Sequence, residues 1–190
     1  MDRIVVIGTT GSGKSTLAAA LAIKLNAKFI ELDALHWQPN WTEAPTEVFR
    51  ERVARAVVGE RWVVGGNYSK ARDLIWSRAD TLVWLDYSFP LVISRLFRRT
   101  VKRIVTQEDL WNTGNRETWR VQFFSRDSLF LWAVKTHGKY RNSIEAVLKQ
   151  PEYAHLHLIR FTSPRATARW LATVPDQTAA DAVTGSGAGS

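Results

Sequence analysis

The residues from Gly8 to Ser15 combine spaced glycines with a lysine and a hydroxyl side chain. They match G-x-x-x-x-G-K-[ST] in full, after four β-branched residues and before an Ala/Leu-rich stretch. Glycine allows positive φ, so successive N–H groups can face one anion, and the start of a helix adds positive partial charge. The segment therefore predicts a phosphate-binding loop (P-loop) for ATP or a close relative.

The polar side chains of this loop have separate expected roles. Lys14 is expected to reach the β- and γ-phosphates, and the Ser15 hydroxyl is expected to ligate magnesium. The predicted nucleotide-binding residues are Gly8, Gly11, Ser12, Gly13, Lys14, Ser15 and Thr16. The alternative is a glycine-rich turn that binds nothing, and the completeness of the motif argues against it.

A carboxylate follows the second apolar run of the chain, in Glu31-Leu32-Asp33-Ala34-Leu35-His36-Trp37. Three interpretations of Asp33 are open on the residues alone: a base for an attacking hydroxyl, a group that holds magnesium through water, or a turn aspartate. His36 is interpreted as a structural hydrogen-bond partner. Trp37 and Trp41 are expected to pack in the core or in a substrate-side lid.

A row of cations forms a third candidate site. They recur at i, i+3, i+4, i+7 and i+8: Arg95, Arg98, Arg99, Lys102 and Arg103. The core-facing side of the same helix is expected to carry Ile93, Phe97, Val101 and Ile104. No acid lies between Tyr87 and Gln107, so these like charges are uncompensated along the helix. The row is interpreted as a lid over phosphates, as a nucleic-acid face or as a solvated face.

Strands and helices alternate along the chain and would position these groups. Strands are predicted at Arg3–Gly8, Lys28–Asp33, Trp62–Gly65, Thr81–Asp86 and His155–Phe161. Helices are predicted near Lys14–Leu25, Thr46–Val58, Pro90–Val105, Glu117–Lys135, Arg141–Lys149 and Pro164–Ala172, with Ser88 and Ser163 as caps. The alternation predicts a mostly parallel sheet covered on both faces, with ligands beyond the carboxyl ends of its strands.

Composition sets broader limits. A length of 190 residues with 45% hydrophobic content fits one domain, expected over residues 1–175, and the 176–190 segment is expected to be a disordered tail. The net charge of +8 favours anionic partners, both phosphorylated metabolites and nucleic acid. The absence of cysteine, of a secretory signal and of a long apolar stretch predicts a cytoplasmic protein without a membrane partner. A monomer and a homodimer are both compatible with the sequence.

Residues 2 to 173 resemble a bacterial family of adenylate-kinase-like or "DNA topology modulation" proteins. Besides the P-loop, the Asp33–Trp37 segment and the arginine-rich helix, the resemblance rests on Gly65-Gly66-Asn67-Tyr68 and Gly114-Asn115-Arg116-Glu117. More distantly, the layout resembles shikimate and gluconate kinases. The resemblance implies an α/β P-loop NTPase three-layer fold with a five-stranded parallel sheet, similar to nucleoside-monophosphate kinases. It also implies a helical lid at about 95–120 and the cofactors ATP and Mg²⁺.

The same resemblance implies roles for individual residues. Asp33 would bind the acceptor hydroxyl, and Arg72 would clamp an acidic group of the acceptor. Asn67 and Arg116 join them as predicted substrate-binding residues. Arg95 would contact the nucleotide, while Arg99 and Arg103 would act with Lys14 and Asp33 in catalysis.

One position departs from the family pattern. The relatives usually carry aspartate where this chain has Gly65, so the usual carboxylate on the magnesium side is missing there. Shikimate kinases also have a glycine run at this place. The leading hypothesis is a kinase that phosphorylates a nucleoside monophosphate or a small hydroxylated metabolite, with weak non-specific binding of nucleic acid. The alternative, favoured by Gly65 and the positive charge, is a nucleotide-dependent regulatory or DNA-associated protein with little kinase activity.

Overall fold

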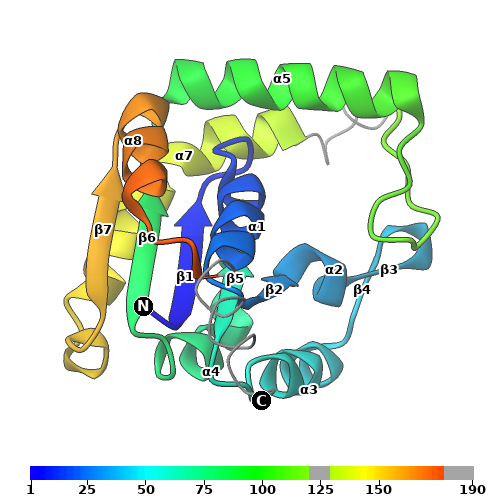
Figure 1. Ribbon diagram of the computed structural model, residues 1–190. Coiled ribbons are helices and arrows are strands. Elements are labelled where there is room, and N and C mark those ends of the chain that lie inside the picture. Colours follow the sequence, from blue (N-terminus) through cyan, green and yellow to red (C-terminus); the bar gives the residue numbers. More distant parts are fainter. Residues whose placement is uncertain (120–128, 178–190) are drawn as a thin grey trace, which may run out of the picture.

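Parallel strands form the central sheet of the computed structural model, which describes residues 1–119 and 129–177 (Figure 1). Their order across the sheet is β2 (Lys28–Glu31), β5 (Trp62–Gly65), β1 (Arg3–Gly8), β6 (Thr81–Leu85) and β7 (His157–Phe161). The central strands are buried on both faces, which is why the sequence shows them as continuous apolar runs. The predicted five-stranded parallel sheet is confirmed.

Alternate side chains of the sheet enter two cores, one on each face. Val5, Ile7 and Val64 pack on the side of α3 (Thr46–Ala56), α4 (Arg72–Trp76) and α7 (Leu129–Leu148). Ile4, Val6 and Val63 pack on the side of α1 (Lys14–Lys24) and α8 (Pro164–Thr173). Helices therefore cover both faces of the sheet, as the alternation predicted, and α5 (Phe89–Thr106) crosses its carboxyl edge (Figure 1).

Most predicted helices agree with the structure to within two residues at each end. The exceptions follow the α5 helix. Residues 116–118 are not helical and Trp119 is, so the predicted start at Glu117 lies two residues early. The predicted end at Lys135 and the new start at Arg141 are wrong, because α7 runs unbroken through both. Ser163 accepts a hydrogen bond from the Ala166 N–H at 3.3 Å and caps α8, whereas the Ser88 side chain makes no capping bond to α5.

A small subdomain between β2 and α3 was not predicted. The second strand ends at Glu31, and Asp33 lies in the first turn of the short helix α2 (Leu32–His36). Then β3 (Trp37–Gln38) and β4 (Thr42–Glu43) pair antiparallel around the 3₁₀ turn η1 (Pro39–Trp41). We call this pair of strands and its turn the hairpin. Two further 3₁₀ turns are η2 (Ser69–Ala71) and η3 (Pro151–Tyr153).

The hairpin is joined to the loop that follows α5, although about 75 residues separate the two in sequence (Figure 1). The Trp41 N–H donates to Asn115 Oδ1 at 2.9 Å, and Asn115 Nδ2 donates to the Gln38 carbonyl at 2.8 Å. Trp41 Nε1 also donates to the Arg116 carbonyl at 3.3 Å. The buried side-chain amide of Asn115 thus makes two of these three hydrogen bonds between the hairpin and the loop after α5.

Two expectations concern other parts of the chain. Within residues 1–119 and 129–177, no helix has both the length and the apolarity that crossing a membrane requires. The predicted tail at 176–190 lies outside the described residues, apart from its first two positions.

Candidate functional site

The P-loop adopts a backbone that needs glycine. Gly11 and Gly13 have φ of 83° and 91°, and Gly13 is the N-cap of α1. A Cβ at Gly8 would lie 2.6 Å from Ser12 Oγ, and a Cβ at Gly11 would lie 2.7 Å from the Val92 carbonyl oxygen. The loop therefore closes tightly on itself and on α5, with the N-terminus of α1 directed at its concave side.

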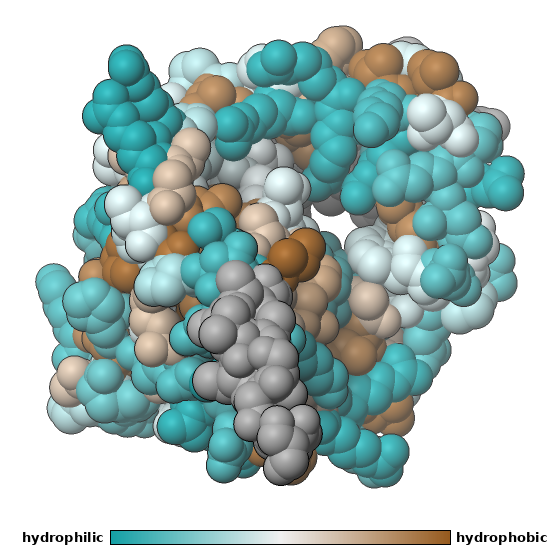
Figure 2. All heavy atoms as spheres, viewed as in Figure 1, coloured by the Kyte–Doolittle hydropathy of each residue, from teal (hydrophilic) through white to brown (hydrophobic). Residues whose placement is uncertain are grey.

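Two cavities open from this loop. The P-loop cavity, of about 520 Å³, is lined by residues 11–16 of the loop, by α5 cations and by Tyr87, Pro164 and Thr167. The hairpin cavity, of about 700 Å³, extends from Lys14 and Ser15 to the hairpin and to the residues after β5. Lys14, Ser15, Arg99 and Arg103 line both. In Figure 2 the surface is hollowed between the main body and the segment running from α5 to the hairpin.

The cations of α5 divide between the cavities and solvent. Arg95, Arg99 and Arg103, spaced four residues apart, line the P-loop cavity, while Arg98 and Lys102 are exposed. The predicted cationic face is therefore divided, with three of its five members at the cavity. Of the expected core face only Ile104 is confirmed, because the other buried residues of α5 are Val92, Leu96 and Thr100, and Phe97 is 48% exposed.

Arg95 and Arg103 are each held by specific partners. Arg95 donates to the Ser12 carbonyl at 3.1 Å and lies over the Tyr87 ring at 5.4 Å, which fixes it beside the P-loop. Arg103 donates to Glu117 Oε1 at 3.0 Å, and Glu117 is only 2% exposed. The compensating acid thus comes from the loop beyond α5, outside the segment in which the sequence showed none.

Arg99 lies between these two arginines and has free donor capacity. Burial lowers its pKa, the neighbouring charge of Arg103 lowers it further, and its buried Nε has no hydrogen-bond partner. A buried guanidinium without a full set of acceptors is suited to bind a phosphate oxygen. Its position at the junction of both cavities agrees with the catalytic role expected for it.

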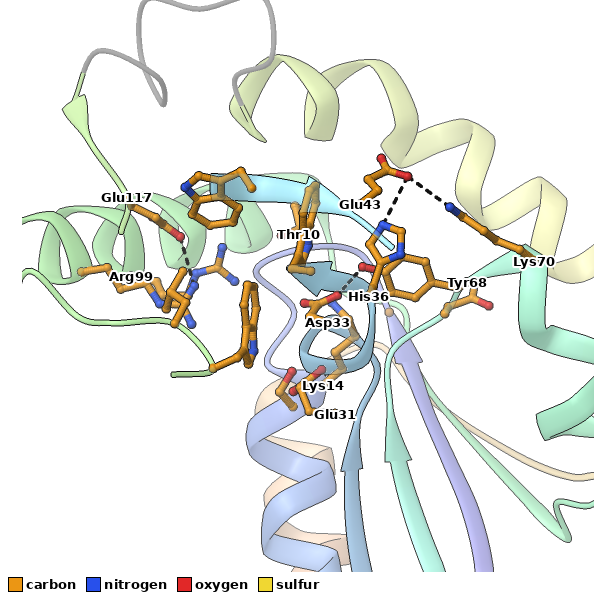
Figure 3. A pocket seen from close by; sticks show the side chains of 18 of the residues that line it. Thr10, Lys14, Glu31, Asp33, His36, Glu43, Tyr68, Lys70, Arg99 and Glu117 are labelled. Carbon is orange, nitrogen blue, oxygen red and sulfur yellow. Dashed lines mark hydrogen bonds and ion pairs between the residues drawn. The ribbon is translucent and has the colours of Figure 1, made fainter. Parts of the chain in front are cut away.

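Asp33 projects into the hairpin cavity (Figure 3). The Tyr68 hydroxyl donates to Asp33 Oδ1 at 2.7 Å, and both burial and this carboxylate raise the pKa of Tyr68. Lys14 is close enough for Asp33 to act on it: burial lowers the pKa of Lys14, and Asp33 opposes that shift. The phenol fixes one carboxylate oxygen of Asp33, a residue that lines the cavity and has the chemistry of a proton acceptor.

Glu31 is a site residue that the sequence analysis did not select. It lines the hairpin cavity beside Lys14, and the nearby Ser15 side chain favours its ionised form. Burial raises the pKa of its carboxyl group, and Oε1 is buried without a hydrogen-bond partner. The sequence could have indicated Glu31, because it lies two residues before Asp33 at the same carboxyl end of the predicted strand.

The position of Glu31 bears on the glycine at position 65. The two residues are direct partners on β2 and β5. A Cβ at Gly65 would lie 3.4 Å from Ser15 Cα, so position 65 faces the start of α1. Among the described residues no group of three or more acidic or histidine side chains could hold a metal ion. The donors that fit magnesium here are Ser15 and the orphaned oxygen of Glu31, completed by phosphate.

Neutral and paired groups line the far end of the hairpin cavity. His36, 2% exposed, packs against Phe49 and Tyr68, and burial lowers its pKa. Its Nε2 lies 3.4 Å from Glu43 Oε2, which also accepts from Lys70 Nζ at 3.1 Å. The histidine is therefore held in its uncharged form at neutral pH.

The other predicted substrate-binding residues are divided. Asn67 lines the hairpin cavity and donates to the Tyr140 hydroxyl at 3.3 Å. Arg72 lines neither cavity and lies over the Trp76 ring at 5.1 Å, and the exposed Arg116 side chain also lines neither. The acid-clamping role of Arg72 and the substrate role of Arg116 stay predictions without support from their positions.

The parallel sheet, the P-loop and the adjoining cavities define a P-loop nucleotide-binding protein of the kinase-like class. Residues 1–123 match the PduV-EutP family, described as "Ethanolamine utilisation - propanediol utilisation", and the chain belongs to that family.

The chain is also similar to shikimate kinases. It is 31% identical over 111 residues to the shikimate kinase of Sulfurihydrogenibium sp. (strain YO3AOP1), covering 50% of this chain and 67% of that one. With the shikimate kinase of Rippkaea orientalis (strain PCC 8801 / RF-1) it shares 27% over 125 residues, covering 57% and 65%. The match thus spans about two thirds of each relative. A structure of shikimate kinase from Acinetobacter baumannii in complex with shikimate superimposes with a TM-score of 0.52 at 15% identity, covering 100% of this chain and 96% of that one, which shows the shared fold.

Proposed function

We propose that this protein transfers the γ-phosphoryl group of ATP to the hydroxyl of a small molecule. The observation that carries this proposal is the junction of the two cavities: Lys14, Ser15, Arg99 and Arg103 line both, and Asp33 faces the second. A donor in the P-loop cavity and an acceptor in the hairpin cavity would therefore meet at these residues.

The reaction follows from this placement. The acceptor oxygen attacks the γ-phosphorus and gives its proton to Asp33, while the bond from the γ-phosphorus to the β–γ bridging oxygen breaks and ADP leaves. Lys14, Arg99 and Arg103 stabilise the negative charge that shifts toward ADP. Magnesium, for which Ser15 and Glu31 are the donors that fit, would neutralise charge on the β- and γ-phosphates.

The alternative of a regulatory or DNA-associated protein rests on a different observation. Arg98 and Lys102 leave a cationic pair on the exposed side of α5. Two cations on one helix give little electrostatic attraction to a duplex, whereas three of the five α5 cations are committed to the P-loop cavity. The larger share of cations at the P-loop cavity favours the kinase over the DNA-associated alternative.

A labelled-ATP screen tests the proposal. The protein is incubated with Mg-ATP and a panel of hydroxylated metabolites and nucleosides, and phosphorylated product is separated from inorganic phosphate. Transfer to at least one acceptor is expected, with product formation well above the ATP hydrolysis seen without acceptor. Duplex DNA is assayed in parallel. If ATP turns over only when DNA is added and no acceptor is labelled, the regulatory alternative replaces the kinase.

A further inference from the structure

The hairpin cavity carries information about the acceptor, because the cations at its acceptor end are paired within the protein. Lys70 is paired with Glu43 at 3.1 Å, and Arg103 is paired with Glu117 at 3.0 Å. Lys14 and Arg99 lie at the junction with the P-loop cavity, where the phosphates of ATP would engage them. His36 is uncharged. In the part of the chain that the structure describes, no cation that lines the acceptor end is left unpaired.

The acceptor end also contains acids. Asp33 and Glu43 both line it, and Figure 3 shows them on the same side of the cavity as Tyr68 and Lys70. An acceptor carboxylate or phosphate placed there would lose hydration, meet these carboxylates and find no free described cation. An uncharged acceptor avoids all of these penalties.

Aromatic rings supply the attractive part of the lining. Trp37 and Trp41 of the hairpin meet edge to face at 5.5 Å, and Trp41 meets Trp111 of the loop after α5 at 6.1 Å. Rings also stand between Arg99 on one side of the cavity and Tyr68 on the other (Figure 3). Trp41 is 37% exposed, so a flat ligand ring would bury tryptophan surface that now contacts water. Such rings favour a planar or apolar body in the acceptor.

Polar groups of the cavity suit hydroxyls and neutral heteroatoms. One oxygen of Asp33 is held by Tyr68, and Asn67 and Ser69 add an amide and a hydroxyl to the lining. Buried groups of this type discriminate strongly in favour of ligands that pair with them.

We propose that the acceptor is an uncharged, hydroxyl-bearing molecule with a flat ring, the chemistry of a nucleoside, and not a nucleoside monophosphate or a hydroxy acid. This inference rests on the proposed kinase function and narrows its acceptor class. In this proposal, the ion pair between Glu43 and Lys70 excludes anionic acceptors.

Matched acceptor pairs test the inference directly. The four common ribonucleosides are compared with their 5′-monophosphates, and shikimate methyl ester is compared with shikimate, at saturating Mg-ATP. In each pair that is turned over, the uncharged member is expected to have at least about a tenfold higher kcat/KM, corresponding to about 1.4 kcal/mol. A preference for the anionic members overturns the inference while leaving the kinase assignment in place.

Two variants sharpen the comparison. Glu43→Gln frees Lys70, so it should raise kcat/KM for anionic members relative to their neutral partners by about tenfold. Lys70→Gln leaves Glu43 unpaired and should change the ratio in the opposite direction. Glu51→Gln is the matched control, because Glu51 pairs with Arg55 on the exposed surface of α3 and lines neither cavity.

The possible results distinguish a failure of the acceptor inference from a failure of the kinase proposal. An unchanged acceptor ratio in both Glu43→Gln and Lys70→Gln overturns the exclusion role of that pair, whatever the overall rate. If no member of any pair is phosphorylated although the wider screen labels another acceptor, the acceptor inference alone fails. If no acceptor in the screen is labelled although calorimetry shows that ATP binds, the kinase proposal fails and the acceptor inference falls with it.

Discussion

The P-loop cavity and the hairpin cavity share residues but are built in different ways. The first is formed by one unbroken motif, residues 11–16, against α5 and α8. The second is assembled from α2, the hairpin, the segment after β5, the loop after α5 and α7, which are far apart in sequence. Phosphate chemistry is common to many substrates and suits a short local motif, whereas acceptor recognition depends on contacts that only the tertiary fold creates.

The largest expected effect concerns the residue common to both cavities. Lys14→Ala should reduce turnover by at least about 10³-fold and weaken ATP binding strongly, because the phosphates lose their direct charged partner. Steady-state kinetics and calorimetry measure the two effects. Arg98→Ala removes an exposed cation from α5 and serves as the control, with ATP affinity expected to stay within twofold. Equal ATP affinity in wild type and Lys14→Ala, with unchanged circular dichroism, would refute the P-loop assignment.

A smaller effect should separate the acceptor site from the donor site. Asp33→Asn keeps the size of the side chain and an acceptor for the Tyr68 hydroxyl, but it removes the base. Turnover should fall by about 10²-fold while ATP affinity stays within a few-fold. If Asp33→Asn loses magnesium-dependent ATP binding instead, Asp33 is part of the magnesium site and not of the acceptor site.

The smallest effects are expected from substitution of Glu31, one on the magnesium requirement and one on the stability of the ligand-free protein. Glu31→Gln should raise the magnesium concentration needed for half-maximal turnover by about tenfold, because a carboxylate donor becomes an amide. A magnesium titration at fixed ATP measures this change. No change in magnesium dependence would show that position 31 does not replace the carboxylate missing at Gly65.

The second effect concerns the stability of the ligand-free protein. Burial raises the pKa of Glu31. A carboxyl group of this kind stabilises the fold below its unfolded pKa, and that contribution is lost as pH rises through the raised native value. Above the raised pKa the ionised group therefore destabilises the protein, and Glu31→Gln should raise Tm there, by about 2–4 °C for each kcal/mol gained. The gain should vanish in acid, where both proteins carry a neutral side chain, and differential scanning calorimetry at two pH values tests it.

The sequence predicted the sheet and the P-loop well for the same reason. Strands buried on both faces, such as Ile4–Ile7, must be apolar throughout, and the P-loop backbone requires glycine at fixed positions. Both constraints are local, so both are visible in the order of residues.

The errors occurred where distant segments decide the outcome. The core face of α5 was displaced by one residue, because Phe97 is apolar yet exposed while Thr100 is polar yet fully buried. The acid that neutralises Arg103 comes from position 117. The hairpin was missed since each of its strands has only two residues and depends on the hydrogen bonds of Asn115. Contacts between such distant segments leave no hydrophobic periodicity in the sequence from which they could be predicted.

Asn115 has a consequence for the motions of the molecule. Its side chain bonds to the backbone at Gln38 and Trp41, and with the bond from Trp41 Nε1 to the Arg116 carbonyl it holds the hairpin to the loop after α5. In the language of amide exchange, we expect two segments distant in sequence to open as one cooperative unit. A ligand that protects one segment from exchange should then protect the other to a related degree.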